Sequence, residues 1–157
     1  MLTKYLLIFL ISMVPLIELR GAIPIAIGMG LDPIASIVIC MVGNMLPVPI
    51  IYMFARRFLL WGKDRRWIGK VCRFFLEKGE RGGRKLTAKA GRRGVMVALL
   101  LFVGLPLPGT GAWTGTLAAS FLDMGPKATA VAVSLGVILS GTIMTIISLL
   151  GLHIFGL

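Results

Sequence analysis

Histidine, cysteine and acidic residues are all scarce in this chain. Its 157 residues include one histidine, two cysteines and six Asp or Glu. Cys40 and Cys72 lie far apart in the sequence and His153 stands alone near the C-terminal end, so no metal-ligand spacing and no disulfide framework can be built from them. This scarcity predicts no metal, no cofactor and no histidine-dependent catalysis.

Long apolar runs, by contrast, dominate the chain. Hydrophobic residues make up 57% of it, whereas soluble domains have about 45–50%. Four blocks are long enough to cross or deeply enter a hydrocarbon core of about 30 Å, which takes about 20 helical residues. They are Tyr5–Leu31, Pro33–Ala55, Val95–Leu122 and Ala128–Leu157. The sequence therefore predicts an all-α, polytopic membrane protein that forms one membrane domain over residues 1–157.

The net charge of +11 comes from one segment. Between Arg56 and Arg93 there are fourteen Lys or Arg and three acidic residues, and the charges outside this segment cancel. Basic loops stay on the cytoplasmic side of a membrane, so residues 56–94 are expected to face the cytoplasm. Nucleic-acid binding is the other use of such charge. A segment tied to membrane blocks at both ends is better explained by topology and anionic lipid headgroups, so we predict lipid partners and no nucleic acid.

The first apolar block contains the stretch Pro15-Leu-Ile-Glu-Leu-Arg-Gly-Ala-Ile-Pro24. A charged side chain at bilayer depth costs about 2.5–3.5 kcal/mol, and broken backbone is tolerated there only where it is buried in protein or faces water. We therefore predict that residues 15–24 form a functional turn, with Glu18, Arg20, Gly21 and Pro24 as site residues.

Each arm beside this turn is too short to span a membrane, which predicts a re-entrant hairpin. Its arms would be Tyr5–Ile17 and Ile25–Leu31; a single kinked helix over residues 5–31 is the alternative. The next block, Pro33–Ala55, has the length of a full span and is interrupted by prolines at positions 47 and 49. Asn44 within it is expected either to make a packing hydrogen bond or to line the same cavity as Glu18.

The second half contains a similar helix-breaking stretch. A thirteen-residue arm, Val95–Leu107, runs into Pro106-Leu-Pro-Gly-Thr-Gly-Ala-Trp-Thr-Gly115, and a second arm, Ala112–Leu122, leads out of it. Prolines and glycines in this density indicate another broken turn at membrane depth. The candidate site residues here are Pro106, Pro108, Gly109, Thr110, Gly111 and Trp113.

Between the two halves, residues 58–94 are amphipathic. Trp67, Val71, Phe74 and Phe75 recur at helical spacing among basic residues, which is typical of a helix that lies in the headgroup plane. The three glycines of Gly79–Lys85 are expected to break that helix.

The order of these features repeats. Pro15 and Pro106 are 91 residues apart, as are Leu31-Asp32 and Leu122-Asp123, and after the aspartate the offset becomes 93. With a basic cytoplasmic segment between them, the two units would be inverted copies, each a re-entrant hairpin followed by a span. This predicts a first repeat over residues 3–56, a linker over 57–94 and a second repeat over 95–157.

The two broken motifs, Pro15–Pro24 and Pro106–Trp113, make the chain resemble the small multidrug export proteins, over nearly its whole length. That family is distantly similar to the DedA superfamily of prokaryotic membrane transporters, some of which are thought to move lipid phosphates. The resemblance implies an integral protein of the cytoplasmic membrane of a prokaryote. DedA proteins place arginines in the second re-entrant region, where this chain has only Thr110, Trp113 and Thr114.

These features predict a proton-coupled membrane transporter. They do not predict an enzyme, because no nucleophile or metal-binding set accompanies Arg20. In the primary hypothesis, Arg20 and backbone amides of Gly109–Gly111 hold an anionic or amphipathic substrate, such as a lipid phosphate. Glu18 would exchange a proton, because burial disfavours its charged form while Arg20 favours it. Alternatives are an exporter of cationic or amphipathic drugs, a lipid-phosphate phosphatase and a non-transporting scaffold; the small-residue stripes are compatible with a homodimer.

Overall fold

The computed structural model describes residues 1–15, 17–107 and 109–155, and every regular element in these ranges is an α-helix. This confirms the predicted all-α class. In chain order the helices are α1 (Leu2–Met13), α2 (Glu18–Gly28), α3 (Pro33–Met45), α4 (Pro47–Gly62), α5 (Gly69–Gly104), α6 (Ala112–Phe121) and α7 (Pro126–Phe155).

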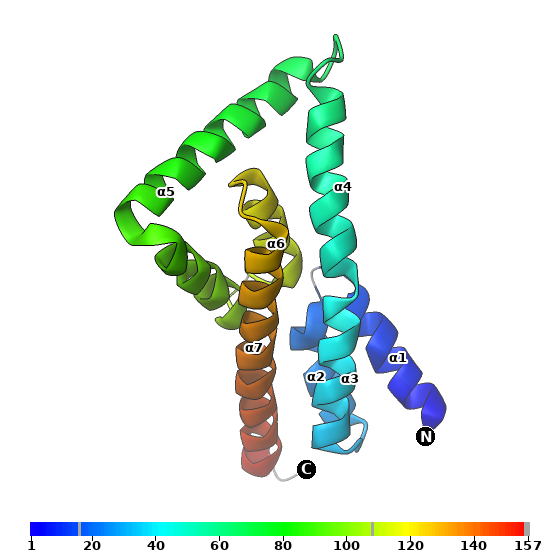
Figure 1. Cartoon of the computed structure of the whole chain (residues 1–157). Helices are drawn as coiled ribbons and strands as arrows, with labels where there is room; N and C mark the ends of the chain where they lie inside the picture. The colour runs from blue at the N-terminus through cyan, green and yellow to red at the C-terminus, as the bar shows by residue number, and fades with distance from the viewer. Residues whose placement is uncertain (16, 108, 156–157) are drawn as a thin grey trace.

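Two long apolar helices form the axis of the molecule. Leu46, between α3 and α4, keeps helical dihedral angles (φ −60°, ψ −41°), so Pro33–Gly62 runs on as one 30-residue element. Pro126–Gly151 is the other, and both are long and apolar enough to cross a membrane. Figure 1 shows α7 beside α3 and α4 and running in the opposite direction. The span predicted from Pro33 is therefore present and ends later than expected.

The outer surface of these helices is apolar and their interior is small and partly polar. On α3, Ile34, Val38 and Val42 are 75%, 53% and 55% exposed. On the opposite side of the same helix Ser36 and Cys40 are fully buried. Soluble monomers rarely expose continuous apolar surfaces of this kind, whereas small interior residues are typical of helices packed in lipid.

The first block folds as two helices that pack against each other, and its break is shorter than predicted. Only residues 14–17 separate α1 from α2, and Glu18 begins α2 with φ at 52°. Gly21 and Pro24, predicted to lie in the turn, lie inside α2. Pro24 lacks only the N–H that would bond the Arg20 carbonyl, and a short helix packed on α1 and α3 tolerates that loss.

The predicted break at Gly79–Lys85 is wrong. Helix α5 runs through this segment and kinks instead at Gly91, which has φ 68° and ψ 169°. The glycines upstream serve a close contact: a Cβ atom on Gly79 or Gly83 would overlap backbone carbonyl oxygens at the end of α6. Tertiary packing therefore outweighs the low helix propensity of glycine here.

This contact leads to a testable difference between neighbouring glycines. Gly79→Ala should destabilise the protein by about 1–3 kcal/mol, because overpacking against backbone cannot relax by a side-chain rotation. Gly82→Ala should be neutral or stabilising by up to about 1 kcal/mol, since its Cβ would meet only the flexible Leu122 side chain, at 3.4 Å. Thermal unfolding in detergent measures both; equal effects would contradict the role of Gly79 in packing.

Three apolar residues of the predicted amphipathic segment are exposed, one just before α5 and two in its basic half. Trp67 is 95% exposed, and Val71 and Phe74 are 55% and 54% exposed; the side chain of Phe75 is outside the described part of the chain. Cys72, one residue beyond Val71, is buried against Gly62 of α4. The start of α5 thus packs against the C-terminal end of α4.

Candidate functional site

The two broken regions of the chain are in contact, through residues that lie 83 or more positions apart in sequence. Residues 14–17 connect α1 to α2, and residues 105–111 connect α5 to α6. The side chains of Glu18 and Arg20, at the start of α2, share six hydrogen bonds with the second connection and the helix ends beside it, residues 103–113. A seventh joins Arg20 to α7. In Figure 1, α1 and α2 approach this meeting point from the end where α3 begins, and α5 and α6 approach it from the other end.

The guanidinium of Arg20 is fully used by the protein itself. Its Nη atoms donate to the carbonyls of Val103 (3.0 Å), Leu105 (2.9 Å), Leu107 (2.6 Å) and Thr110 (2.5 Å). Its Nε donates to Ser140 Oγ of α7 at 3.5 Å. A guanidinium has five N–H groups, and five acceptors lie around this one. Arg20 therefore satisfies the carbonyls that the end of α5 leaves without helical partners.

Glu18 performs the opposite task at the start of α6. Its side chain is 5% exposed, and its carboxylate accepts hydrogen bonds from the backbone N–H groups of Ala112 (3.3 Å) and Trp113 (3.1 Å). These are the free N–H groups of a helix N-terminus, where the helix dipole stabilises a negative charge. Among the described residues Glu18 and Arg20 form no ion pair with each other. Helices α1 and α2 form the first helical hairpin and α5 and α6 the second; Arg20 is bound at the end of α5 and Glu18 at the start of α6.

Both charged residues line a cavity of about 400 Å³. The carboxylate of Glu18 accepts two hydrogen bonds and has capacity for about two more. All of the N–H groups of Arg20 are occupied, so of the two charged groups in this cavity only the Glu18 carboxylate has unsatisfied hydrogen-bond capacity, that of an acceptor. The lining residues are Pro15, Glu18, Arg20, Pro106, Leu107, Gly109, Thr110, Trp113, Thr114, Leu117 and Met144.

The predicted site residues divide into three groups. Glu18, Arg20, Pro106, Gly109, Thr110 and Trp113 line the cavity. Gly111 lies against the Glu18 carboxylate. Gly21, Pro24 and Asn44 are not among the lining residues, and Pro108 lies outside the described residues.

Asn44 is buried at 1% exposure, and its Oδ1 atom has no hydrogen-bond partner among the described residues. Asn44 is not among the residues that line the cavity. Of its two expected roles, the packing hydrogen bond is not seen at Oδ1 and the cavity lining is not observed.

Sequence reasoning missed the contribution of the long helix α7. Ser140 and Met144 of α7 reach the site, one as an acceptor for Arg20 and the other as a cavity wall. The small and polar residues of this helix indicated only a helix interface. Which of them face the first hairpin depends on how α7 is rotated, and no local pattern reports that.

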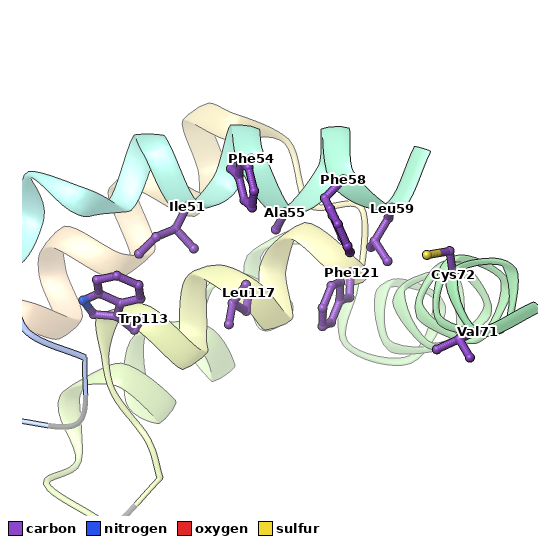
Figure 2. Close-up of a pocket in the computed structure, with 10 residues that line it drawn as sticks. All are labelled: Ile51, Phe54, Ala55, Phe58, Leu59, Val71, Cys72, Trp113, Leu117 and Phe121. Carbon is purple, nitrogen blue, oxygen red and sulfur yellow. The ribbon is translucent and has the colours of Figure 1, made fainter. Parts of the chain in front are cut away.

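Trp113 occupies a special position in the site. It lines the polar cavity on one side and an apolar cavity of about 410 Å³ on the other. Its indole Nε1 is buried and has no partner among the described residues, and Figure 2 shows this nitrogen on the side of the ring turned away from the apolar cavity. A buried donor without an acceptor is unusual in folded proteins.

Gly111 is the position where the site tolerates least change. Its φ of 149° disfavours any side chain, and a Cβ atom there would overlap the Glu18 carboxylate. Gly111→Ala should therefore displace Glu18 from the α6 N-terminus and lower the free energy of unfolding by about 2–4 kcal/mol, combining backbone strain with a lost charged hydrogen bond. Gly28→Ala is the control, since nothing lies within 4 Å of its Cβ. Thermal unfolding of the two variants in detergent should differ clearly; a Gly111→Ala protein as stable as the control would contradict this geometry.

The comparisons with known proteins agree with the resemblance seen in the sequence. Residues 18–143 match the family model described as "Putative small multi-drug export protein". This match begins at Glu18, directly after the first connection, and includes Arg20, the second connection and more than half of α7. The chain matches none of the curated proteins and none of the solved structures with which it was compared. Because the match covers well over half of its length, the chain belongs to the family of small multidrug export membrane proteins.

Proposed function

We propose that this protein exports small amphipathic cations across the membrane in exchange for protons, through the cavity at the meeting point of its two hairpins. The observation that carries the proposal is the unequal state of the two charged residues. Every N–H group of Arg20 is bound to the protein, whereas the Glu18 carboxylate faces the cavity with acceptor capacity to spare.

This proposal takes up the drug-export alternative in place of an anionic or lipid-phosphate substrate. A phosphate would need free donors, and Arg20 could supply them only by releasing the carbonyls of the α5 end. The amides at the start of α6 already hold the Glu18 carboxylate, an anion that belongs to the chain. An ammonium or another cation needs only the free side of that carboxylate.

The Glu18 carboxylate also accounts for the proposed exchange with protons. A cation and a proton compete for one carboxylate, so binding of either one displaces the other. The exchange moves one positive charge each way and leaves the buried site neutral overall, which avoids the cost of an uncompensated charge in a low-dielectric interior. Transport rather than catalysis is also favoured by the absence of a His, Cys, Asp and Glu cluster that could hold a metal in the described residues.

Corresponding backbone geometry supports two structural repeats. Gly30 after α2 and Asp123 after α6 both have positive φ, 70° and 56°. The next residues, Leu31 and Met124, each donate an N–H to the carbonyl five residues earlier. Both pairs are 93 residues apart (123 − 30 and 124 − 31), so Leu31 corresponds to Met124 and not to Leu122 as the sequence predicts.

Contacts between the helices correspond as well. A Cβ atom on Gly43 of α3 would lie 2.7 Å from the Phe9 carbonyl of α1, and one on Gly136 of α7 would lie 2.8 Å from the Leu100 carbonyl of α5. The glycines of the two long helices are therefore 93 residues apart (136 − 43). Their carbonyl partners in α1 and α5, the first arms of the two repeats, are 91 residues apart (100 − 9). The two additional residues of the second repeat therefore lie in its broken connection, 105–111.

The opposite directions of the long helices support inverted copies of one unit. In this arrangement each unit is a re-entrant hairpin followed by a span, the hairpin tips meet at mid-membrane, and the basic segment 57–94 lies on the cytoplasmic side. The placement of a site between inverted repeats lets the two halves exchange conformations and open the cavity to each side in turn.

Reconstituted protein tests the proposed function. Proteoliposomes are loaded with decyltrimethylammonium or, in parallel, with an isoprenyl phosphate, and outward release is measured after an inward proton gradient is imposed. We expect gradient-dependent release of the cation and none of the phosphate. Release of the phosphate alone would overturn the choice of substrate class, and release of neither from correctly folded protein would overturn transport of both classes.

A further inference from the structure

The apolar cavity beyond Trp113 is an elongated groove between three helices. Figure 2 shows α4 side chains along one side, α6 side chains along the other and α5 side chains at the far end. Its volume is about 410 Å³, and its lining is wholly apolar apart from Trp113 and Cys72. The lining residues are Ile51, Phe54, Ala55, Phe58, Leu59, Val71, Cys72, Trp113, Leu117 and Phe121.

This groove adjoins the polar cavity, with the Trp113 side chain between the two spaces. Trp113 and Leu117 line both spaces, so a molecule with its head at Glu18 can extend past the indole into the groove. From Trp113 to Phe121 the α6 backbone rises about 12 Å. A space this long with walls on both sides fits a single flexible chain better than a broad polycyclic ring system.

The rim of the groove is open along its side. Phe54, Phe58 and Val71 line it and are 68%, 46% and 55% exposed. In a membrane this side faces lipid, so a hydrocarbon chain can enter sideways without passing through water. Transfer of a chain from lipid to an apolar groove gains little hydrophobic free energy. The groove would therefore fix where the hydrocarbon chain lies, and so select among substrates, without adding much to their affinity.

We propose that this groove holds the hydrocarbon tail of a single-chain cationic amphiphile whose head group lies at Glu18. The inference rests on the proposed function, because it takes the cation at Glu18 as the anchor of the tail. It narrows the substrate class from amphipathic cations in general to those with one extended alkyl chain, drawn laterally from the bilayer.

A second apolar cavity provides an internal control. It has a volume of about 210 Å³, lies between the second half of α5 and the other side of α6, and shares no lining residue with the polar cavity. Ala98 lines this control cavity and Ala55 lines the groove. Ala55→Leu and Ala98→Leu therefore add the same group to two apolar spaces, only one of which adjoins the site.

The experiment is photo-crosslinking of the full chain in phosphatidylcholine vesicles. The probe is decyltrimethylammonium with a diazirine at the end of its alkyl chain, and the labelled residues are identified by mass spectrometry. We expect the label within residues 51–72 and on Phe121. Ala55→Leu should reduce it at least five-fold, and Ala98→Leu should leave it unchanged. Label distributed over the exposed apolar faces of α3 and α7 instead, or equal effects of the two variants, would overturn the inference.

Competition separates this inference from the proposed function. Excess tetramethylammonium has a head group and no tail, so it should displace the probe from the groove if the head is held at Glu18. Labelling of the groove that tetramethylammonium does not reduce would overturn the role of Glu18 as the anchor and with it the inference. A second probe carries its diazirine on the head group. If tetramethylammonium protects Trp113 from this probe while the tail-labelled probe labels scattered residues, the cation site is supported and only the tail groove is overturned. Since the wild-type protein supplies both readings, neither depends on the folding of a variant.

Discussion

Arg20→Ala is expected to destabilise the protein by about 3–5 kcal/mol, the usual cost of removing one partner from a buried charged network. The substitution removes a charged donor from the carbonyls of Val103, Leu105 and Leu107. The last two keep their hydrogen bonds from the Thr110 hydroxyl and from nearby backbone N–H groups. It also removes the main polar connection between the two hairpins. For a chain of this size the midpoint of thermal unfolding should fall by about 10 °C, measured in detergent by tryptophan fluorescence.

Two further variants identify the cause of that loss. Arg20→Lys keeps the charge but supplies three donors in place of five, so it should restore only part of the stability. Arg84→Ala removes an exposed arginine whose ion pair with Glu80 lies on the surface of α5, and it should change the free energy of unfolding by no more than about 0.5 kcal/mol. An Arg20→Ala protein that unfolds within 2 °C or so of the wild type would show that Arg20 does not hold the hairpins together.

Glu18→Gln is expected to abolish transport driven by the proton gradient while leaving most of the protein folded. The glutamine oxygen can still accept one hydrogen bond from the start of α6, but its NH₂ group cannot accept the second. This should cost about 1–3 kcal/mol of stability. The neutral side chain neither releases a proton nor attracts a cation, so release of decyltrimethylammonium from proteoliposomes should become independent of pH and fall at least ten-fold.

Controls for this variant distinguish lost coupling from lost folding. Glu80→Gln removes a carboxylate from the exposed surface of α5 and should transport at the wild-type rate. Glu18→Asp keeps the charge on a shorter side chain, so it should retain pH-dependent transport at a reduced rate. If Glu18→Gln, shown by its thermal unfolding to be folded, transports at the wild-type rate with the same pH dependence, Glu18 has no part in coupling.

Much of the fold could be predicted because it depends on local properties of the sequence. The four apolar blocks, the short arms and the full length of the span after Pro33 follow from runs of apolar residues. Glu18 and Arg20 could be recognised as site residues because charges are costly within such runs. The family resemblance rests on the same two motifs, and the match over residues 18–143 confirms it.

Other predictions went wrong where packing decides. Gly79 and Gly83 were expected to break a helix, yet they lie within α5 because their missing side chains admit the end of α6. Gly21 and Pro24 were expected in a turn, yet they extend α2, which α1 and α3 support on either side. Glycine and proline lower helix propensity by about 1 and 3 kcal/mol, and tertiary contacts can exceed those amounts.

By itself, the sequence determined that this chain is helical and apolar, that two of its apolar blocks are interrupted near Pro15 and Pro106, and that Glu18 and Arg20 lie beside the first interruption. Hydrophobicity, backbone restriction and charge are properties of single residues and their neighbours, so a local pattern reports them. Only the tertiary structure decided what those charges do. The acceptors of Arg20 are 83–120 residues away in sequence and the donors to Glu18 are 94 and 95 residues away. Such partners are set by how one hairpin docks on the other, and that docking leaves a carboxylate, rather than a guanidinium, open to a ligand.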